Sequence, residues 1–363
     1  MPGKPTSLIL IALGLAALVG CGSSPSSSTS PPSFPNSHTA YVALPTSNAV
    51  GGYKINNTTA SFATILGSPY PGGTSPASVV VHPSNRFVYA ANQGGNNISL
   101  FNVDSTLGSL LEVLPRTPAG LTPAFLTMDS GGNFLYVVNR VSSSISVYSI
   151  DSGSGALTAV SGSPFPTFRD PIALALAPSG KFLYVLNGNV GAVFAYTVAA
   201  GVLQAVAGPP ALVGNGPVAI TVDPAEPFVY VANAVDSTVS VLSINSGTGA
   251  LSIVGTYATG TQPTSLAVLG QFLYVANQGS SNVSVFSVDP TTGVLAQITG
   301  SPFAAGSSPL FEVLDPNNLF LYIGSQEART ITALSIDATT GALTTTAEST
   351  STGVSPASMS VSK

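Results

Sequence analysis

The chain contains very little cysteine and histidine. Its 363 residues include one cysteine, Cys21, and two histidines, His38 and His82. A single cysteine excludes intramolecular disulfides and cysteine-based metal clusters, and two histidines leave little material for a Ser-His-Asp triad. The sequence also shows no metal-ligand cluster, no phosphate-binding glycine loop and no Gly-x-Ser-x-Gly motif. We therefore expect neither a metal nor another cofactor.

Charge is scarce as well. Charged residues make up 6% of the chain, against roughly 25% in an average soluble protein. The net charge is −5 and Lys and Arg form no cluster, so the chain lacks the basic surface that binds nucleic acid or an acidic membrane. Solubility must come from Ser, Thr, Asn and Gly. We expect no nucleic-acid partner.

The first residues have the pattern of an export signal. An apolar run over residues 8–19 is shorter than the about 20 residues that a transmembrane helix needs. It leads into Leu-Val-Gly-Cys at residues 18–21, which resembles the lipobox of bacterial lipoproteins and implies cleavage before Cys21 and lipidation of that cysteine. The alternative is an ordinary secretory signal. We expect residues 1–20 to be a signal peptide and residues 21–37, rich in Ser and Pro, to be a disordered tether.

The residue after this cysteine bears on the location. Gly22 stands where the inner-membrane retention signal of this class has Asp. In a Gram-negative cell the expected location is therefore the outer membrane or its periplasmic face. We expect a monomer that contacts the membrane through its lipid anchor only.

The chain is rich in one repeat. A motif of the form Phe/Val/Leu-x-Tyr-Val-x-Asn returns seven times, and its tyrosines lie 44 to 48 residues apart: Tyr41, Tyr89, Tyr136, Tyr184, Tyr230, Tyr274 and Tyr322. A period in this range, with short β-rich runs and Gly/Pro turns, is typical of a β-propeller blade. The sequence therefore predicts an all-β fold over residues 38–363, a seven-bladed β-propeller of four-stranded antiparallel blades.

Each repeat divides into four strands, here called A to D. In the second repeat they are expected at residues 77–82, 87–91, 98–103 and 110–114. The first repeat begins at His38 with strand B, and the chain ends in a strand A without successors, so we expect these ends to pair and close the ring. The predicted blades are 39–70 with 355–363, then 75–115, 122–165, 170–209, 216–257, 262–303 and 308–348.

Recurring polar residues have structural interpretations. The turns between strands C and D read Asp-x-x-x-Gly, as at residues 104–108 and 151–155. Strand B ends in Asn in most repeats, as at Asn92 and Asn139. Because Asp and Asn side chains bond nearby backbone N–H groups and Gly accepts positive φ, we expect both sets to form turns.

The Tyr-Val-x-Asn core, as in residues 272–277, resembles the YVTN-type propeller repeat. Together with the Asp-x-x-x-Gly-x-Leu turns and the Gly-Ser-Pro-Phe segments at 162–165 and 300–303, it makes residues 39–363 resemble the seven-bladed lactonase family, which includes the bacterial 6-phosphogluconolactonase. The resemblance implies a propeller fold and hydrolysis of a lactone. The histidine that this family places at the start of strand A has no match in this chain.

One repeat departs from the others on strand A. The third residue after the proline that opens this strand is large and apolar in six repeats and is Glu312 in the seventh. Strand A is expected to line the centre of the ring, where a carboxylate needs a partner or a raised pKa. Such a group can act as a general base on water. The alternative is a structural glutamate held by backbone N–H groups or by an arginine.

A second candidate group comes from loops at one rim. Arg140 joins strands B and C of the third repeat, and Arg169 and Asp170 precede strand A of the fourth. This group could bind a carboxylate or phosphate, or stabilise an oxyanion; the alternative is a solvated ion pair. Glu327 and Arg329 form a weaker candidate pair.

Three interpretations of function remain open. The lipid anchor and the scarcity of titratable residues favour a surface-anchored propeller that binds a protein, a glycan or a small lactone. The family resemblance favours the alternative, a 6-phosphogluconolactonase-like carboxylic ester hydrolase in which Glu312 is the base and Arg140 or Arg169 stabilises the oxyanion. The third is a rigid structural spacer of the cell envelope.

Overall fold

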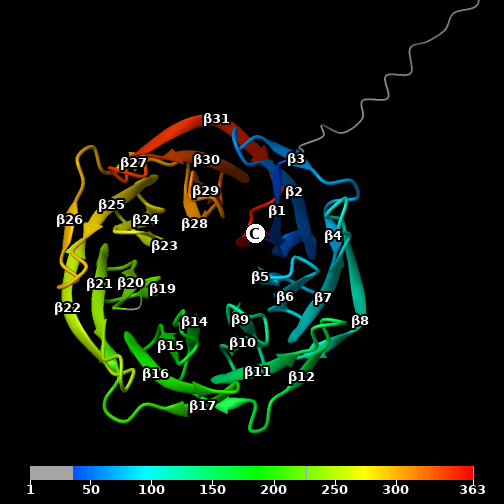
Figure 1. The fold of residues 1–363 in the computed structure, drawn as a ribbon, viewed down its shortest axis with the longest axis horizontal. Coiled ribbons are helices and arrows are strands. Elements are labelled where there is room, and N and C mark those ends of the chain that lie inside the picture. Colours follow the sequence, from blue (N-terminus) through cyan, green and yellow to red (C-terminus); the bar gives the residue numbers. More distant parts are fainter. Residues whose placement is uncertain (1–35, 226, 363) are drawn as a thin grey trace, which may run out of the picture. The chain divides into compact units, whose positions relative to one another are not determined.

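Seven antiparallel sheets surround a common centre (Figure 1). The computed structural model describes residues 36–225 and 227–362, so Cys21 and the predicted signal peptide lie outside the described residues. The one helix within these ranges is the 3₁₀ turn η1 (Pro45–Ser47). In the same ranges, no helix has the length and apolar character needed to cross a membrane.

The strands nearest the centre begin at or just after a proline. A proline fits the first position of a strand because it has no N–H to donate to a neighbour. Each of these strands lies beside the innermost strands of the two adjacent sheets, which makes the ring continuous. In the order of blades 1 to 7 they are β32 (Ser358–Val361), β5 (Pro76–Val81), β9 (Pro123–Met128), β14 (Pro171–Leu176), β19 (Pro217–Val222), β23 (Pro263–Leu269) and β28 (Pro309–Leu314).

The next strands carry the repeated tyrosines, and all seven rings are fully buried. Some of the tyrosine hydroxyls reach the adjacent blade: Tyr41 Oη donates to the Gly108 carbonyl and Tyr89 Oη to the Gly155 carbonyl, each at 2.7 Å. The repeated motif therefore joins blades to one another. The strands are β1 (Ser37–Leu44), β6 (Phe87–Asn92), β10 (Phe134–Asn139), β15 (Phe182–Asn187), β20 (Phe228–Asn233), β24 (Phe272–Asn277) and β29 (Phe320–Ser325).

The third strands pair with these along their whole length. They are β2 (Ala49–Asn56), β7 (Asn97–Val103), β11 (Ser144–Ile150), β16 (Ala192–Ala199), β21 (Thr238–Ile244), β25 (Asn282–Val288) and β30 (Thr330–Ile336).

The outermost strand differs between blades. It is continuous in blades 2, 5 and 7, as β8 (Leu110–Pro118), β22 (Leu251–Ala258) and β31 (Leu343–Ser351). In blades 1, 3, 4 and 6 it is broken into two segments that pair with the same neighbour: β3 (Phe62–Thr64) and β4 (Tyr70–Pro71), β12 (Leu157–Ala159) and β13 (Phe165–Pro166), β17 (Val202–Ala205) and β18 (Ala211–Leu212), β26 (Leu295–Gln297) and β27 (Phe303–Ala304). The predicted end of strand D at residue 114 was wrong, since β8 continues to Pro118. Its partly exposed residues lack the apolar pattern that marks a buried strand.

Closure of the ring follows the prediction. The C-terminal strand β32 pairs antiparallel with β1, with Met359 opposite Val42 and Ser360 opposite Tyr41. Residues from both ends of the propeller therefore form blade 1, and the seven-bladed all-β fold is confirmed.

The recurring polar residues divide into two kinds. Asp104 Oδ1 accepts the N–H groups of Thr106 at 2.9 Å and Leu107 at 2.7 Å, so the aspartates of these turns act as predicted. For the asparagine side chains the turn prediction was wrong. Asn92 is buried, and its Nδ2 donates to Ser99 Oγ on β7 at 2.9 Å. Asn139, Asn233 and Asn277 also tie the second strand of the blade to the third, whereas Asn187 Nδ2 donates to the carbonyls of Phe168 and Arg169 in the loop before its blade.

Candidate functional site

A cavity of about 540 Å³ lies at the centre of the ring, lined by the innermost strands of all seven blades. Its size falls within the roughly 300–1,000 Å³ of small-molecule sites in proteins. Among the residues that line it, Glu312 is the only one with an ionisable side chain. The cavity and this carboxyl together form the candidate site.

Glu312 is buried without a partner. Its residue is 6% exposed, and neither carboxyl oxygen has a hydrogen-bond partner among the described residues. Burial raises the pKa of the Glu312 carboxyl well above its usual range. The backbone N–H groups of Ala267 and Ala276 lower the pKa of this carboxyl, but by less than burial raises it. Neither N–H group completes a hydrogen bond to the carboxyl. No arginine contacts the carboxyl in the described part of the chain, and the only groups near it that favour its charged form are these two backbone N–H groups.

The backbone around Glu312 is held from two sides. Its N–H donates to Ser265 Oγ on β23 of blade 6, at 3.1 Å. The preceding residue, Phe311, packs its ring over Gly324 of β29, where an added Cβ would lie 2.0 Å from the ring. Gly324 thus provides room for Phe311, and both contacts set the position of the inner strand of blade 7.

Ser265 lines the same cavity and was not singled out from the sequence. Ser78 and Ser358 occupy the equivalent position on other blades and accept backbone N–H groups in the same way. In blade 6 alone the N–H belongs to a glutamate. Because Ser265 Oγ accepts that bond, its own hydrogen remains available for donation. Comparing the second residue after each strand A proline does not single it out, because three repeats have serine there.

Electrostatic coupling links Glu312 to the adjacent blade. Burial raises the pKa of the Tyr274 hydroxyl, and the nearby Glu312 carboxyl raises it further. Tyr274 Oη has no hydrogen-bond partner among the described residues, unlike Tyr41 and Tyr89. Tyr322 Oη of blade 7 likewise has no partner among the described residues, so the tyrosine contacts of blades 6 and 7 lack the hydrogen bond made by Tyr41 and Tyr89.

The candidate group of Arg140, Arg169 and Asp170 at the rim is formed in part. Arg140 Nε donates to Asp170 Oδ1 at 2.5 Å, with side chains 49% and 28% exposed, and joins blades 3 and 4. The Arg169 side chain makes no hydrogen bond or ion pair within the described ranges. None of these three residues lines the central cavity. The structure thus brings Arg140 and Asp170 together but does not join them to Glu312.

The weaker candidate pair is not formed. Glu327 Oε2 accepts a hydrogen bond from Ser307 Oγ at 3.0 Å, and Glu327 makes no ion pair with Arg329 in the described part of the chain.

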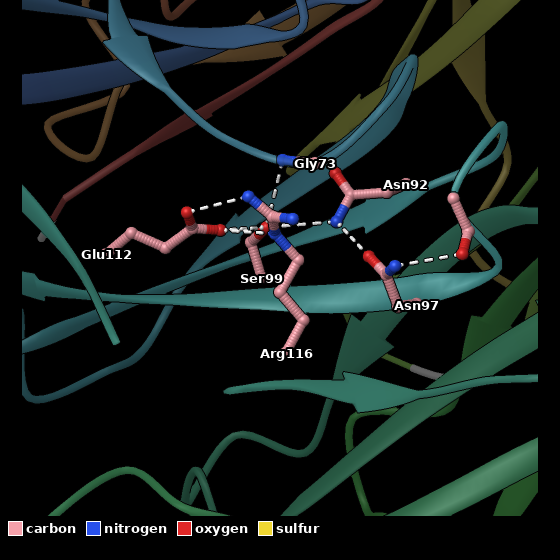
Figure 2. Close-up of polar contacts among 7 residues, drawn as sticks. Gly73, Asn92, Asn97, Ser99, Glu112 and Arg116 are labelled. Carbon is pink, nitrogen blue, oxygen red and sulfur yellow. Dashed lines mark hydrogen bonds and ion pairs between the residues drawn. The ribbon is translucent and has the colours of Figure 1, made fainter. Parts of the chain in front are cut away.

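A second glutamate has all the partners that Glu312 lacks (Figure 2). Arg116 donates to both carboxyl oxygens of Glu112, at 2.7 and 2.9 Å, and Ser99 Oγ donates to one of them at 2.6 Å. The Asn92 amide and the Gly73 N–H donate in turn to Ser99 Oγ, at 2.9 and 3.2 Å. This network joins three strands of blade 2 and the loop before it. It was not predicted, because its members lie on three different strands and in a loop and meet only in the folded blade.

Solved structures with the same fold include several lactonases. A putative 6-phosphogluconolactonase from Bacteroides fragilis is 20% identical, with 92% of this chain and 100% of that chain covered and a TM-score of 0.76. A putative 6-phosphogluconolactonase from Bacteroides uniformis is 19% identical, with 90% and 99% covered and a TM-score of 0.77. The periplasmic gluconolactonase of Pseudomonas aeruginosa is 20% identical, with 90% and 99% covered and a TM-score of 0.75. At these identities the likeness establishes the fold alone.

Sequence comparison gives the family. No curated protein sequence matches the chain. The family model described as lactonase, 7-bladed beta-propeller matches residues 33–168 and 174–304. These matches span most of the propeller, so the chain belongs to the seven-bladed β-propeller lactonase family.

Proposed function

We propose that this protein hydrolyses a lactone in its central cavity, with Glu312 as the group that transfers the proton. The observation that carries the proposal is the buried, unpartnered carboxyl of Glu312, a residue that lines the cavity. A strongly perturbed carboxyl in a cavity is a candidate catalytic group. Family membership supports the hydrolase over the surface-anchored binding module, which the composition alone had favoured. The names of the similar Bacteroides and Pseudomonas structures point to the same class of reaction.

The chemistry needs one proton acceptor that later becomes a donor. In its ionised form Glu312 takes a proton from water while the water oxygen attacks the lactone carbonyl carbon. The ring C–O bond then breaks, and the departing alkoxide takes that proton from Glu312, which yields the open hydroxy acid. A base works best when its pKa lies near the working pH, and the raised pKa of Glu312 moves it in that direction.

The negative charge on the carbonyl oxygen also needs a donor. Ser265 lines the cavity and has a hydroxyl hydrogen available for this role. Arg140 and Arg169, the donors predicted from the sequence, lie outside the cavity lining, so this mechanism does not use them. Export and lipidation at Cys21 remain part of the proposal and would place the reaction at the cell envelope.

The test is turnover of δ-lactones by the full chain purified in detergent, followed in a pH-stat. Glu312→Gln should lower kcat by about 10²–10⁴-fold, the usual contribution of general acid–base catalysis. Glu112→Gln, a matched change at a glutamate outside the cavity, should leave kcat within about twofold. Absence of turnover by the unmodified chain, or equal rates for Glu312→Gln and the unmodified chain, would reject the hydrolase and favour the binding module.

A further inference from the structure

The central cavity has an apolar wall. Apart from Glu312, its only polar side chains are Ser and Thr: Thr127, Thr221, Thr264, Ser265 and Ser358. The remaining lining residues are Ala, Val, Leu, Ile, Phe and Met, with no Lys, Arg or His among the described residues of the wall. A phosphate in this cavity would lose its hydration without meeting a cation, which is strongly unfavourable.

Two apolar residues of the cavity wall are partly exposed. Phe125 of blade 3 and Val218 of blade 5 both line the cavity and are 36% and 38% exposed. Exposed apolar side chains also lie in the rim loops of blades 3 to 5, at Leu121, Val141, Phe168 and Val235. The rim of blades 2 and 6 carries Gln93 and Gln278 at the position equivalent to Arg140. The exposed apolar side chains of this rim therefore lie in blades 3 to 5, in the same loops as the charged residues Arg140, Arg169 and Asp170.

The arc of blades 3 to 5 faces the catalytic candidate across the ring. Figure 1 shows β28, which carries Glu312, on the opposite side of the centre from β9 and β14. A ligand whose ester group reaches Glu312 can extend its other end toward Phe125 and the apolar rim. The cavity volume of about 540 Å³ leaves room for such a substituent.

We infer that the site takes a neutral lactone that carries an apolar alkyl or acyl substituent. The inference rests on the proposed lactonase function and names its substrate class. It separates this chain from an enzyme for a phosphorylated sugar lactone, because the cavity wall offers an apolar surface and a single carboxyl. The ester group would lie at Glu312 and Ser265, and the substituent against Phe125 and Val218.

The substrate class is tested by measuring binding and turnover as two separate quantities. Affinities of the full chain carrying Glu312→Gln are measured by calorimetry for δ-valerolactone, δ-decalactone, glucono-δ-lactone and 6-phosphoglucono-δ-lactone, and kcat/KM is measured for the same compounds on the unmodified chain. Affinity should rise from δ-valerolactone to δ-decalactone by up to about fourfold per buried CH₂ group. Phe125→Ser should reduce this rise severalfold. Leu114→Ser, at an exposed leucine of β8 outside the cavity lining, is the matched control and should leave it unchanged.

The outcomes separate the two proposals. Tighter binding or faster turnover of 6-phosphoglucono-δ-lactone, or no gain from the alkyl chain, overturns the inference while leaving a lactonase. Selective binding of δ-decalactone without turnover of any lactone overturns the proposed hydrolase and supports the apolar ligand class of the cavity. If Phe125→Ser fails to fold, Val218→Ser gives the same test from blade 5.

Discussion

Glu112 and Glu312 are two glutamates on strands at opposite edges of their blades. Glu112, on the outermost strand of blade 2, is bound by Arg116 and Ser99. Glu312, on the innermost strand of blade 7, is more deeply buried and has no hydrogen-bond partner among the described residues. A fully bonded carboxyl contributes to stability, whereas an unbonded buried one lowers it. When a residue that lines a cavity lowers the stability of the fold, its side chain is a candidate for a catalytic role rather than a structural one.

The largest effect is expected at the glycine beneath Phe311. In Gly324→Ala the new Cβ would lie 2.0 Å from the Phe311 ring, which is too close for either to remain in place. We expect a loss of about 3 kcal/mol in the free energy of unfolding, at the upper end for overpacking. Denaturant unfolding measures it. Phe311→Ala combined with Gly324→Ala should recover part of the loss, and failure to do so would contradict this packing.

Replacing each glutamate by leucine tests the comparison directly. Glu312→Leu removes an unpartnered buried carboxyl and should raise the free energy of unfolding by about 1–3 kcal/mol, while abolishing turnover. Glu112→Leu should lower it, because Arg116 and Ser99 lose their acceptor. Both are measured by denaturant unfolding at pH 6. A loss of stability in both variants would mean that Glu312 has a structural partner after all.

The pH dependence of stability should come in part from Glu312. Its pKa is raised in the folded chain, so above about pH 4.5 the folded state binds a proton that the unfolded state has lost. This contribution is complete below the unfolded pKa and disappears as pH rises through the folded pKa, with a slope of at most about 1.4 kcal/mol per pH unit. Unfolding midpoints between pH 5 and 9 should therefore fall, and Glu312→Gln should flatten the curve. An unchanged curve in that variant would show that another group titrates.

The network around Glu112 should give a smaller effect. Arg116 is about one-third exposed, so water replaces part of what the ion pair contributes. We expect Glu112→Ala to lower the free energy of unfolding by about 1 kcal/mol. A double-mutant cycle with Arg116→Ala should give a coupling of similar size. A coupling near zero would assign the effect to Ser99 instead.

The inner part of each blade could be predicted from the sequence, and the outer part less well. The second strand of each blade is buried on both faces and the innermost strand on one, so their apolar runs, tyrosines and opening prolines repeat clearly. The end of β8 leaves no such signal, whereas the breaks in three of the other outer strands coincide with a repeated Gly-Ser-Pro, at residues 67–69, 162–164 and 300–302. Glu312 could be found because it is an exception in an apolar position. Ser265 could not be found in this way. The equivalent residues of two other blades, Ser78 and Ser358, are also serines, and both have a structural role.

The smallest effect is expected at the rim. Arg140→Ala removes an exposed ion pair with Asp170 and should change the free energy of unfolding by less than about 0.5 kcal/mol. Because Arg140 does not line the cavity, kcat/KM for δ-decalactone should also remain unchanged. Arg169→Ala, at the neighbouring arginine without a charged partner within the described ranges, is the matched comparison. A rise in KM confined to an anionic lactone in either variant would show that the rim binds negative charge, and would bring Arg140, Arg169 and Asp170 back into the site.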